Sequence, residues 1–136
     1  MALDPALAGR RFTAATPYTV SVEKIAEFRA AIGDSSPGPP DQAPFTFPMV
    51  VAFGLMTELM TDPSVGIDLR NVVHRDERIE QVRPVRAGDQ LVGSLVVDSV
   101  RSAAGVDLIA TRTELATAAG EPVGTASATL VHRAAS

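Results

Sequence analysis

The stretch IGDSSPGPPDQAP, residues 32–44, holds the residues of this 136-residue chain whose types and spacing best fit acid–base chemistry. The carboxylate of Asp34 ends a helical pattern, and Pro37 follows three residues later. A carboxylate can move a proton in catalysis only with an acid or base partner within hydrogen-bond reach, directly or through one water. Residues 35–44 contain no His, Glu, Lys or Tyr, and Asp41 is their one other titratable group. Asp34 is therefore a candidate catalyst whose partner must come from elsewhere.

The two histidines of the chain, His74 and His132, both lie in strand-like segments and are expected to face solvent. His74 is kept as a substitute partner for Asp34, on the condition that its strand begins beside the helix that follows the loop. The alternative interpretation of Asp34 is a helix-end carboxylate that accepts hydrogen bonds from nearby backbone N–H groups.

Two helices flank this loop. A helix is predicted over Val22–Ile32, after a short strand at Tyr18–Val20, with Ser21 as its N-cap and Glu23 favourably placed in its first turn. One face of this helix is expected to be apolar, through Val22, Ile25, Phe28 and Ile32.

The second helix, over Met49–Met60, is predicted to follow Thr46 as a cap and to carry Pro48 in its first turn, where the missing N–H does no harm. Its sequence MVVAFGLMTELM has one charge, Glu58, so residues 46–60 are predicted to be buried on nearly all sides. One small sheet covers one side of such a helix, and we therefore expect a dimer whose second subunit covers the rest.

Four strand-like runs rich in Val, Ile, Thr and Leu make up the second half of the chain. They are Asn71–Val82, Gln90–Val100, Val106–Thr117 and Pro122–Arg133. Their short connections predict an antiparallel meander. The predicted fold class is α+β, with an antiparallel sheet wrapped around one long central helix.

The composition of the chain excludes several classes of function. Hydrophobic residues make up 46% of the chain and charged ones 21%, which is typical of a folded domain. The net charge of −4 argues against a nucleic-acid partner, and the absence of cysteine excludes disulfides and thiolate catalysis. No segment is long enough for a membrane span or a signal peptide, so a cytoplasmic location is expected. Five arginines cluster between residues 70 and 86, either as a solvated strand face or as a site for an anionic partner.

The segment RPVRAGDQL, residues 83–91, resembles the R-P-V-x-x-G-D-x-L turn of MaoC-like hot-dog dehydratases. Three other segments are similar to the first helix, the start of the central helix and the last strand of that family. They are VEKIAEFRAAIGD (22–34), APFTFP (43–48) and VGTASATLVHR (123–133). The resemblance covers nearly the whole chain and implies a single hot-dog domain over residues 1–136. It is closest to the N-terminal-dehydratase-type subunits of actinobacterial acyl-carrier-protein dehydratases.

Active members of the family carry Asp-x-Asn-Pro-x-His in this loop. Asp34 and Pro37 match its Asp and Pro, whereas Ser36 replaces the Asn and Pro39 stands at the position of the His. Residues 38–47 resemble the later part of the family's loop, so the alignment breaks after Pro37 and the segment that carries the His is absent. The resemblance thus implies an incomplete Asp/His dyad.

The resemblance also implies the ligand. It is an acyl thioester of acyl-carrier protein or coenzyme A, bound by the backbone N–H groups of Phe45, Thr46 and Phe47 and by Arg83 and Arg86, without a cofactor or a metal. The partner is expected to be a hot-dog subunit, in a homodimer or a heterodimer. Two alternatives stay open: a non-catalytic acyl-binding or stabilising subunit, and a hot-dog thioesterase that uses Glu58. The thioesterase fits less well, because Glu58 lies well past the first turn of its helix.

Overall fold

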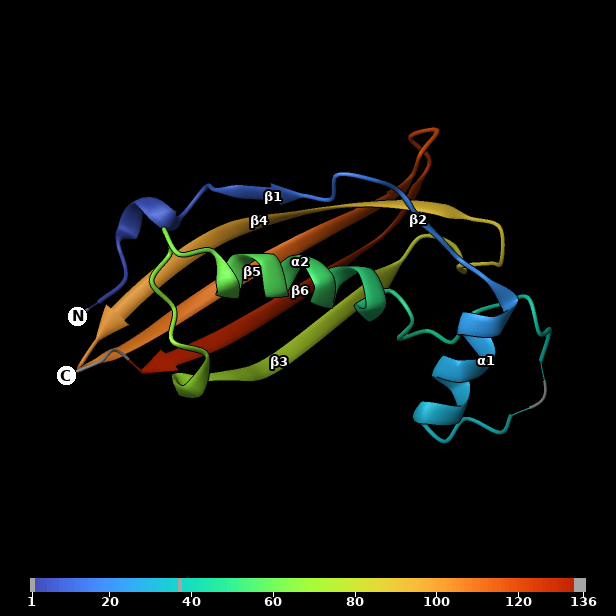
Figure 1. The fold of residues 1–136 in the computed structure, drawn as a ribbon, viewed down its shortest axis with the longest axis horizontal. Helices are drawn as coiled ribbons and strands as arrows, with labels where there is room; N and C mark the ends of the chain where they lie inside the picture. Colours follow the sequence, from blue (N-terminus) through green and yellow to red (C-terminus); the bar gives the residue numbers. More distant parts are fainter. Residues whose placement is uncertain (1, 37, 134–136) are drawn as a thin grey trace.

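A six-stranded antiparallel sheet and two α-helices form the fold in a computed structural model that describes residues 2–36 and 38–133 (Figure 1). The strands are β1 (Arg11–Thr13), β2 (Tyr18–Thr19), β3 (Val72–Gln81), β4 (Gln90–Ala103), β5 (Val106–Thr117) and β6 (Pro122–Arg133). The helices are α1 (Val22–Ala31) and α2 (Met49–Thr61), with short 3₁₀ turns η1 (Pro5–Leu7) and η2 (Leu69–Asn71). The α+β class is confirmed, and β1 is a strand that the sequence did not predict.

The strand order is β1-β4-β5-β6-β3, with β2 also paired to β4. The predicted meander is therefore wrong for β3, which pairs with β6 and not with its neighbour in sequence. The connection between β3 and β4 does not turn back on itself, because its backbone bonds to other segments. Val85 O accepts from Ala43 N at 2.8 Å, and Gly88 N donates to Val20 O at 2.8 Å. These bonds hold the connection across the end of the sheet. β4 therefore starts on the other side of β5 and β6 from β3.

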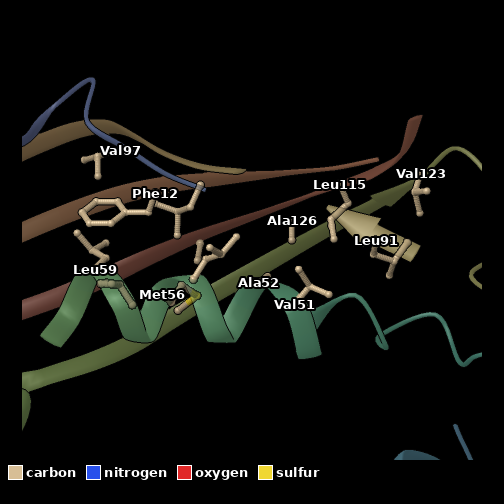
Figure 2. Packing of buried hydrophobic residues seen from close by; sticks show 14 of the residues in the cluster. Phe12, Val51, Ala52, Met56, Leu59, Leu91, Val97, Leu115, Val123 and Ala126 are labelled. Carbon is tan, nitrogen blue, oxygen red and sulfur yellow. The ribbon is translucent and has the colours of Figure 1, made fainter. Parts of the chain in front are cut away.

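Helix α2 lies along one face of the sheet and supplies the centre of the hydrophobic core (Figure 2). The buried residues follow one helical stripe: Val51, Ala52, Leu55, Met56 and Leu59. The opposite stripe is open, and Phe53 at its centre is 53% exposed. The prediction of a sheet-covered helix is thus confirmed for its inner face, whereas burial on all sides is not achieved within one chain. Pro48 occupies the N-cap position in place of Thr46.

Helix α1 begins as predicted, because the Ser21 hydroxyl accepts a hydrogen bond from Lys24 N at 3.0 Å and Glu23 lies in the first turn. The apolar face is narrower than expected. Ile25 is fully buried, while Val22 and Ile32 are 47% and 50% exposed. The helix lies off the end of the sheet at which α2 starts, so only its middle reaches the core (Figure 1).

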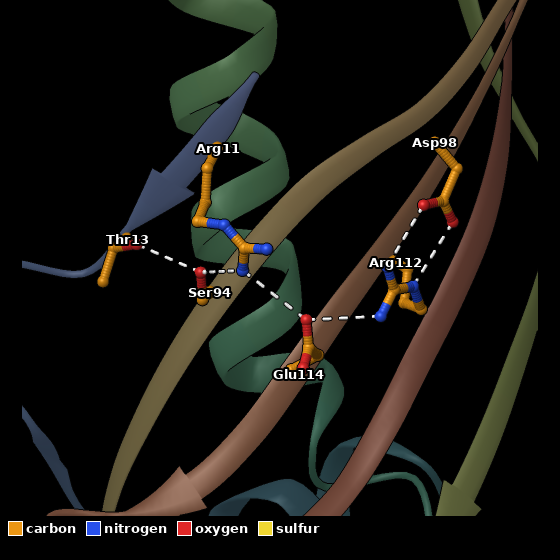
Figure 3. Close-up of polar contacts among 6 residues, drawn as sticks. All are labelled: Arg11, Thr13, Ser94, Asp98, Arg112 and Glu114. Atoms are coloured by element: carbon orange, nitrogen blue, oxygen red, sulfur yellow. Dashed lines mark hydrogen bonds and ion pairs between the residues drawn. The ribbon is translucent and has the colours of Figure 1, made fainter. Parts of the chain in front are cut away.

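The face of the sheet away from α2 carries a ladder of polar side chains across β1, β4 and β5 (Figure 3). Arg11 donates to Ser94 Oγ at 3.0 Å and pairs with Glu114 at 3.5 Å. Arg112 bridges Glu114 and Asp98 at 3.2 and 3.3 Å. These groups are largely solvated, and each such pair contributes about 0–1 kcal/mol. The ladder marks this face as the solvated side of the sheet.

His132 contradicts the expectation that it faces solvent, since it is 3% exposed on the inner face of β6. Its Nδ1 lies 2.9 Å from Asp107 Oδ2, and its Nε2 accepts from the backbone N–H of Asp68 at 3.1 Å. This arrangement places the ring proton on Nδ1. Asp107 Oδ1 also accepts from the Ser102 hydroxyl at 2.5 Å and from Leu3 N at 3.3 Å. The pair therefore joins the chain's first residues, the β4–β5 hairpin, β6 and the segment before η2.

Gly93 on β4 allows the close approach of α2 to the sheet. A Cβ at this position would lie 2.8 Å from both Leu55 Cδ1 and Val51 Cγ1. We expect Gly93→Ala to lower the free energy of unfolding by about 1–3 kcal/mol, because the two side chains must leave their packed positions. Urea denaturation measures this. Gly54→Ala on α2 is the matched control, because it meets nothing within 4 Å and should stabilise the helix by about 0.5–1 kcal/mol; equal effects of the two changes would contradict the packing described.

The Asp107–His132 pair makes the free energy of unfolding depend on pH in the acid range. Burial alone raises the pKa of Asp107, but the hydrogen bonds from Ser102, His132 and Leu3 outweigh it and lower the pKa below its usual value. The stabilising effect is therefore complete above about pH 4 and is lost as the pH falls through the lowered pKa. We expect Asp107→Asn to lose about 2 kcal/mol at pH 7 and to flatten the loss of stability below pH 4. Asp98→Asn in the solvated ladder serves as the control, and should leave both the stability and its pH profile nearly unchanged.

Candidate functional site

Asp34 is held in place by its own loop. Its Oδ1 accepts from the Ser36 hydroxyl at 2.5 Å and from Ser36 N at 3.0 Å, and its Oδ2 pairs with Arg29 at 3.5 Å. The hydroxyl and N–H of Ser36, together with the charge of Arg29, lower the pKa of Asp34 below its usual value. A lowered pKa weakens the carboxylate as a base near neutral pH. The geometry is that of a turn-forming, ion-paired carboxylate; Pro37 lies outside the described residues.

Arg29, in the last turn of α1, contacts this loop and was not predicted from the sequence as part of the site. Besides Asp34, it donates from Nη2 to the backbone oxygen of Gln42 at 2.9 Å, so that it ties the end of α1 to both ends of the loop. Its position, five residues before Asp34 and in the last turn of α1, was a signal available in the sequence.

His74 does not reach Asp34. It lies in the third position of β3, and its Nε2 is 3.0 Å from Glu77 Oε2. β3 starts beyond the C-terminal end of α2, whereas α1 and the loop that follows it lie beyond the N-terminal end (Figure 1). The 13 residues of α2 span about 20 Å, so the two groups lie at opposite ends of the helix.

The segment before α2 offers two backbone donors and not three. Phe47 N donates to Pro44 O at 3.0 Å, and Met49 N and Val50 N are likewise engaged in turn bonds. Phe45 N and Thr46 N donate to no backbone acceptor within the described ranges 2–36 and 38–133. The Phe47 ring is fully buried against Phe28, at 5.3 Å between ring centroids. Two N–H groups near the positive end of the α2 dipole are thus available to an oxygen of a ligand.

The two arginines of the RPVR segment differ in what they contact. Arg83 pairs with both oxygens of Asp89, at 2.9 and 3.1 Å, and also with Glu121, and it donates to Pro84 O. All three guanidinium nitrogens of Arg83 are therefore engaged within the connection between β3 and β4 and with Glu121. Arg86 is exposed, and its side chain makes no ion pair in the part of the chain that the structure describes. Of the predicted pair, only Arg86 is free for an anionic ligand.

The wider arginine cluster is neutralised along the chain. Arg70 pairs with Asp68, Arg75 with Asp76 and Arg78 with Glu80. The arginine cluster was expected to be either a solvated strand face or a site for an anionic partner. These local ion pairs fit the solvated strand face. Glu58 is exposed in the third turn of α2, away from the free N–H groups. Among residues 2–36 and 38–133 no group of three metal-ligating side chains is assembled, and no helix is long and apolar enough to cross a membrane.

The model of the family "FAS1-like, dehydratase domain region" matches residues 6–126. The chain belongs to this family. A UPF0336 protein of Streptomyces coelicolor is 41% identical to it, with 99% of this chain and 98% of the relative covered. That alignment is 147 positions long against 136 residues here, so at least eleven positions have no counterpart in this chain.

Solved structures show the hot-dog fold of this FAS1-like dehydratase member. The truncated HadBC complex of Mycobacterium tuberculosis, a (3R)-hydroxyacyl-ACP dehydratase, contains a chain that is 27% identical with a TM-score of 0.80, covering 92% of this chain and 96% of that one. A MaoC-like dehydratase is 31% identical with a TM-score of 0.84, covering 96% of this chain and 43% of that one. The resemblance to MaoC-like hot-dog dehydratases is confirmed.

The contacts of the two arginines predict different effects on folding. Arg83→Ala should lower the free energy of unfolding by about 1–2 kcal/mol, since Asp89 loses its paired, partly buried partner. Arg86→Ala, at an exposed position, should stay within about 0.5 kcal/mol of the parent. Urea denaturation of both variants tests this, and a loss for Arg86→Ala as large as that for Arg83→Ala would contradict the assignment.

Proposed function

We propose that this chain is the acyl-thioester-binding subunit of a dehydratase acting on (3R)-hydroxyacyl thioesters, and that a second hot-dog chain supplies the working Asp and His. The observation that carries this proposal is the state of Asp34. It is ion-paired with Arg29, hydrogen-bonded to Ser36 and placed a helix length from His74. Among residues 2–36 and 38–133, Asp34 contacts no acid–base partner with which it could add or remove water.

The partner is inferred to be a different chain with an intact dyad. A second copy of this chain would bring a second Asp34 and the same His74 and His132, and His132 has both ring nitrogens occupied. The HadBC complex, whose fold this chain shares, joins two different subunits. A heterodimer therefore fits a FAS1-like dehydratase member with this loop better than a homodimer does.

Three features support a surface for that partner. The open stripe of α2, with Phe53 at its centre, leaves apolar area uncovered in the single chain. Strand β3 is a ten-residue edge strand whose outer hydrogen-bonding side pairs with no other strand of the described residues. Glu77 on β3 keeps an Oε1 atom that is buried without a partner, and burial raises its pKa. A second chain along α2 and β3 would cover the apolar stripe and offer donors to Glu77.

The thioester is proposed to bind at the start of α2. Phe45 N and Thr46 N are free to hold its carbonyl oxygen, where the helix dipole favours negative charge. Arg86 lies on the connection that is hydrogen-bonded to the segment just before α2, through Ala43 N to Val85 O and Ala87 N to Asp41 O. It is placed to attract the phosphate of the pantetheine arm of acyl-carrier protein or coenzyme A.

We expect the purified chain alone to hydrate crotonyl-CoA no faster than buffer, because its dyad is incomplete. Together with a hot-dog chain from the same organism that carries an intact Asp and His, it should give stereospecific hydration to the (3R)-hydroxy product. Absorbance of the enoyl thioester follows turnover, and chiral chromatography follows the product.

Matched substitutions separate the two chains in this assay. Asp34→Asn should leave turnover by the complex within a few-fold, whereas the same change in the partner's catalytic Asp should abolish it. Arg86→Ala should raise the KM for crotonyl-CoA several-fold, with Arg112→Ala as a control that leaves it unchanged. Robust turnover by this chain alone, lost in Asp34→Asn, would refute the proposal and direct attention to another acid–base partner.

A further inference from the structure

The end of β3 is joined to the segment before α2 by one side chain (Figure 1). Gln81, the last residue of β3, donates from Nε2 to the backbone oxygen of Phe45 at 2.9 Å. The two residues lie 36 positions apart in the sequence. Within the described ranges 2–36 and 38–133, no other side chain forms a hydrogen bond with the backbone of residues 43–48.

This bond fixes the direction of the peptide unit between Phe45 and Thr46. In a trans peptide the C=O and the N–H point in opposite directions, so a Phe45 carbonyl held toward Gln81 turns the Thr46 N–H away from it. A hydrogen bond to the carbonyl also polarises the peptide and strengthens its N–H as a donor. Gln81 therefore acts on one of the two free donors before α2 without contacting that donor.

The neighbouring peptide units are held by the main chain. Pro44 O accepts from Phe47 N and Thr46 O accepts from Met49 N, both at 3.0 Å. The first of these bonds fixes the peptide that carries the Phe45 N–H. Backbone bonds therefore position one of the two free donors, whereas the other depends on a side chain from a distant strand.

Gln81 is itself held by a close approach of β3 to β6. It lies opposite Gly124, where a Cβ would collide with Glu80 O and lie 3.2 Å from the Cα of Gln81. The next residue, Val82, donates from its backbone N to Val123 O at 2.8 Å. The base of the Gln81 side chain is thus fixed, so the side chain loses less conformational entropy when it bonds to the distant carbonyl.

We propose that Gln81 is a positioning residue for the thioester carbonyl, because it aims the Thr46 N–H at the carbonyl oxygen. The inference rests on the proposed function, which places that oxygen at the N–H groups of Phe45 and Thr46. Negative charge develops on this oxygen when water adds to an enoyl thioester. A correctly aimed donor therefore stabilises the transition state more than it strengthens binding of the substrate.

Infrared difference spectroscopy reads the hydrogen bonds to this oxygen directly. The probe is crotonyl-CoA with ¹³C at its carbonyl, bound to the full chain alone and to a complex whose partner has its catalytic Asp replaced by Asn, so that the thioester is not consumed. In the parent, the carbonyl stretch should lie below that of the free thioester. Gln81→Leu should reduce this shift to about half, because one of two donors is no longer aimed at the oxygen.

Two further substitutions separate the donor from the size of the side chain. Gln81→Glu keeps nearly the same shape, but an ionised carboxylate only accepts hydrogen bonds, so it should reduce the shift as Gln81→Leu does. Gln81→Lys keeps a donor at the end of a flexible chain and should restore most of the shift. Glu80→Gln is the matched control at the neighbouring exposed position of β3, and should leave the shift unchanged.

Turnover of crotonyl-CoA by the complex with an intact partner gives a second readout. Gln81→Leu should lower kcat by about 10–100-fold and leave KM within about threefold of the parent, because the donor acts mainly on the transition state. Glu80→Gln should change neither. Circular dichroism and thermal unfolding establish that each variant folds.

The possible outcomes distinguish this inference from the proposed function. A carbonyl shift that Gln81→Leu and Gln81→Glu leave unchanged would overturn the role of Gln81 alone. A raised KM with unchanged kcat and unchanged carbonyl shift would show that Gln81 only supports the binding surface, and would overturn it too. If the parent does not bind the probe, or binds it without a carbonyl shift, the proposed thioester site and this inference are both wrong.

Discussion

The packing of one apolar helix against one antiparallel sheet is the constraint on which the rest of this molecule depends. Gly93 lets Leu55 and Val51 lie directly on β4, and this contact fixes the distance between α2 and the sheet. Because the sheet covers only the inner stripe, the helix keeps one open stripe, with Phe53 at its centre, and one grooved side toward residues 14–18. The start of α2 is held at the same time by turn bonds from residues 44–48, which leave two backbone donors free. This packing contact thus helps to position the start of α2, the groove and the open stripe of the helix.

Local patterns predicted the elements well, and non-local contacts account for what they missed. The bounds of α1 and α2 and of three long strands were predicted to within one residue, since helical and strand periodicity and the Ser21 cap are local signals. The partner of β3 was not predictable from loop length, because bonds from Val85 and Gly88 to distant segments decide the path of the connection. Burial of His132 also depends on a distant residue, Asp107, whose carboxylate satisfies the ring only in the folded chain.

For the candidate site, the sequence predicted which residue types are present but not which of them are already engaged. Arg83 and Arg86 look alike in the sequence, yet Asp89 and Glu121 occupy the first and leave the second free. Asp34 was recognised from its motif, whereas Arg29, which fixes its charge and position, belongs to no motif. The groove beside Gly54 could not be predicted, because it depends on where residues 14–18 run relative to α2. Pairing within the folded chain therefore decides which charges remain for a ligand.

The connection from β3 to β4 passes across the end of the sheet, and it affects the order in which the strands can pair. The β4–β5 and β5–β6 hairpins join neighbours in sequence, the first through a two-residue turn at Ala104 and Gly105, and such local pairings close rapidly. β3 must instead pair with β6 across a long separation in sequence, with Val72 opposite His132. Closing this long loop costs more conformational entropy, so we expect this pairing to form after the two hairpins. During synthesis β3 leaves the ribosome well before the strand that receives it. The edge at which we propose that a partner binds is then the last part of the sheet to form, so that on this proposal the subunit is completed before it associates.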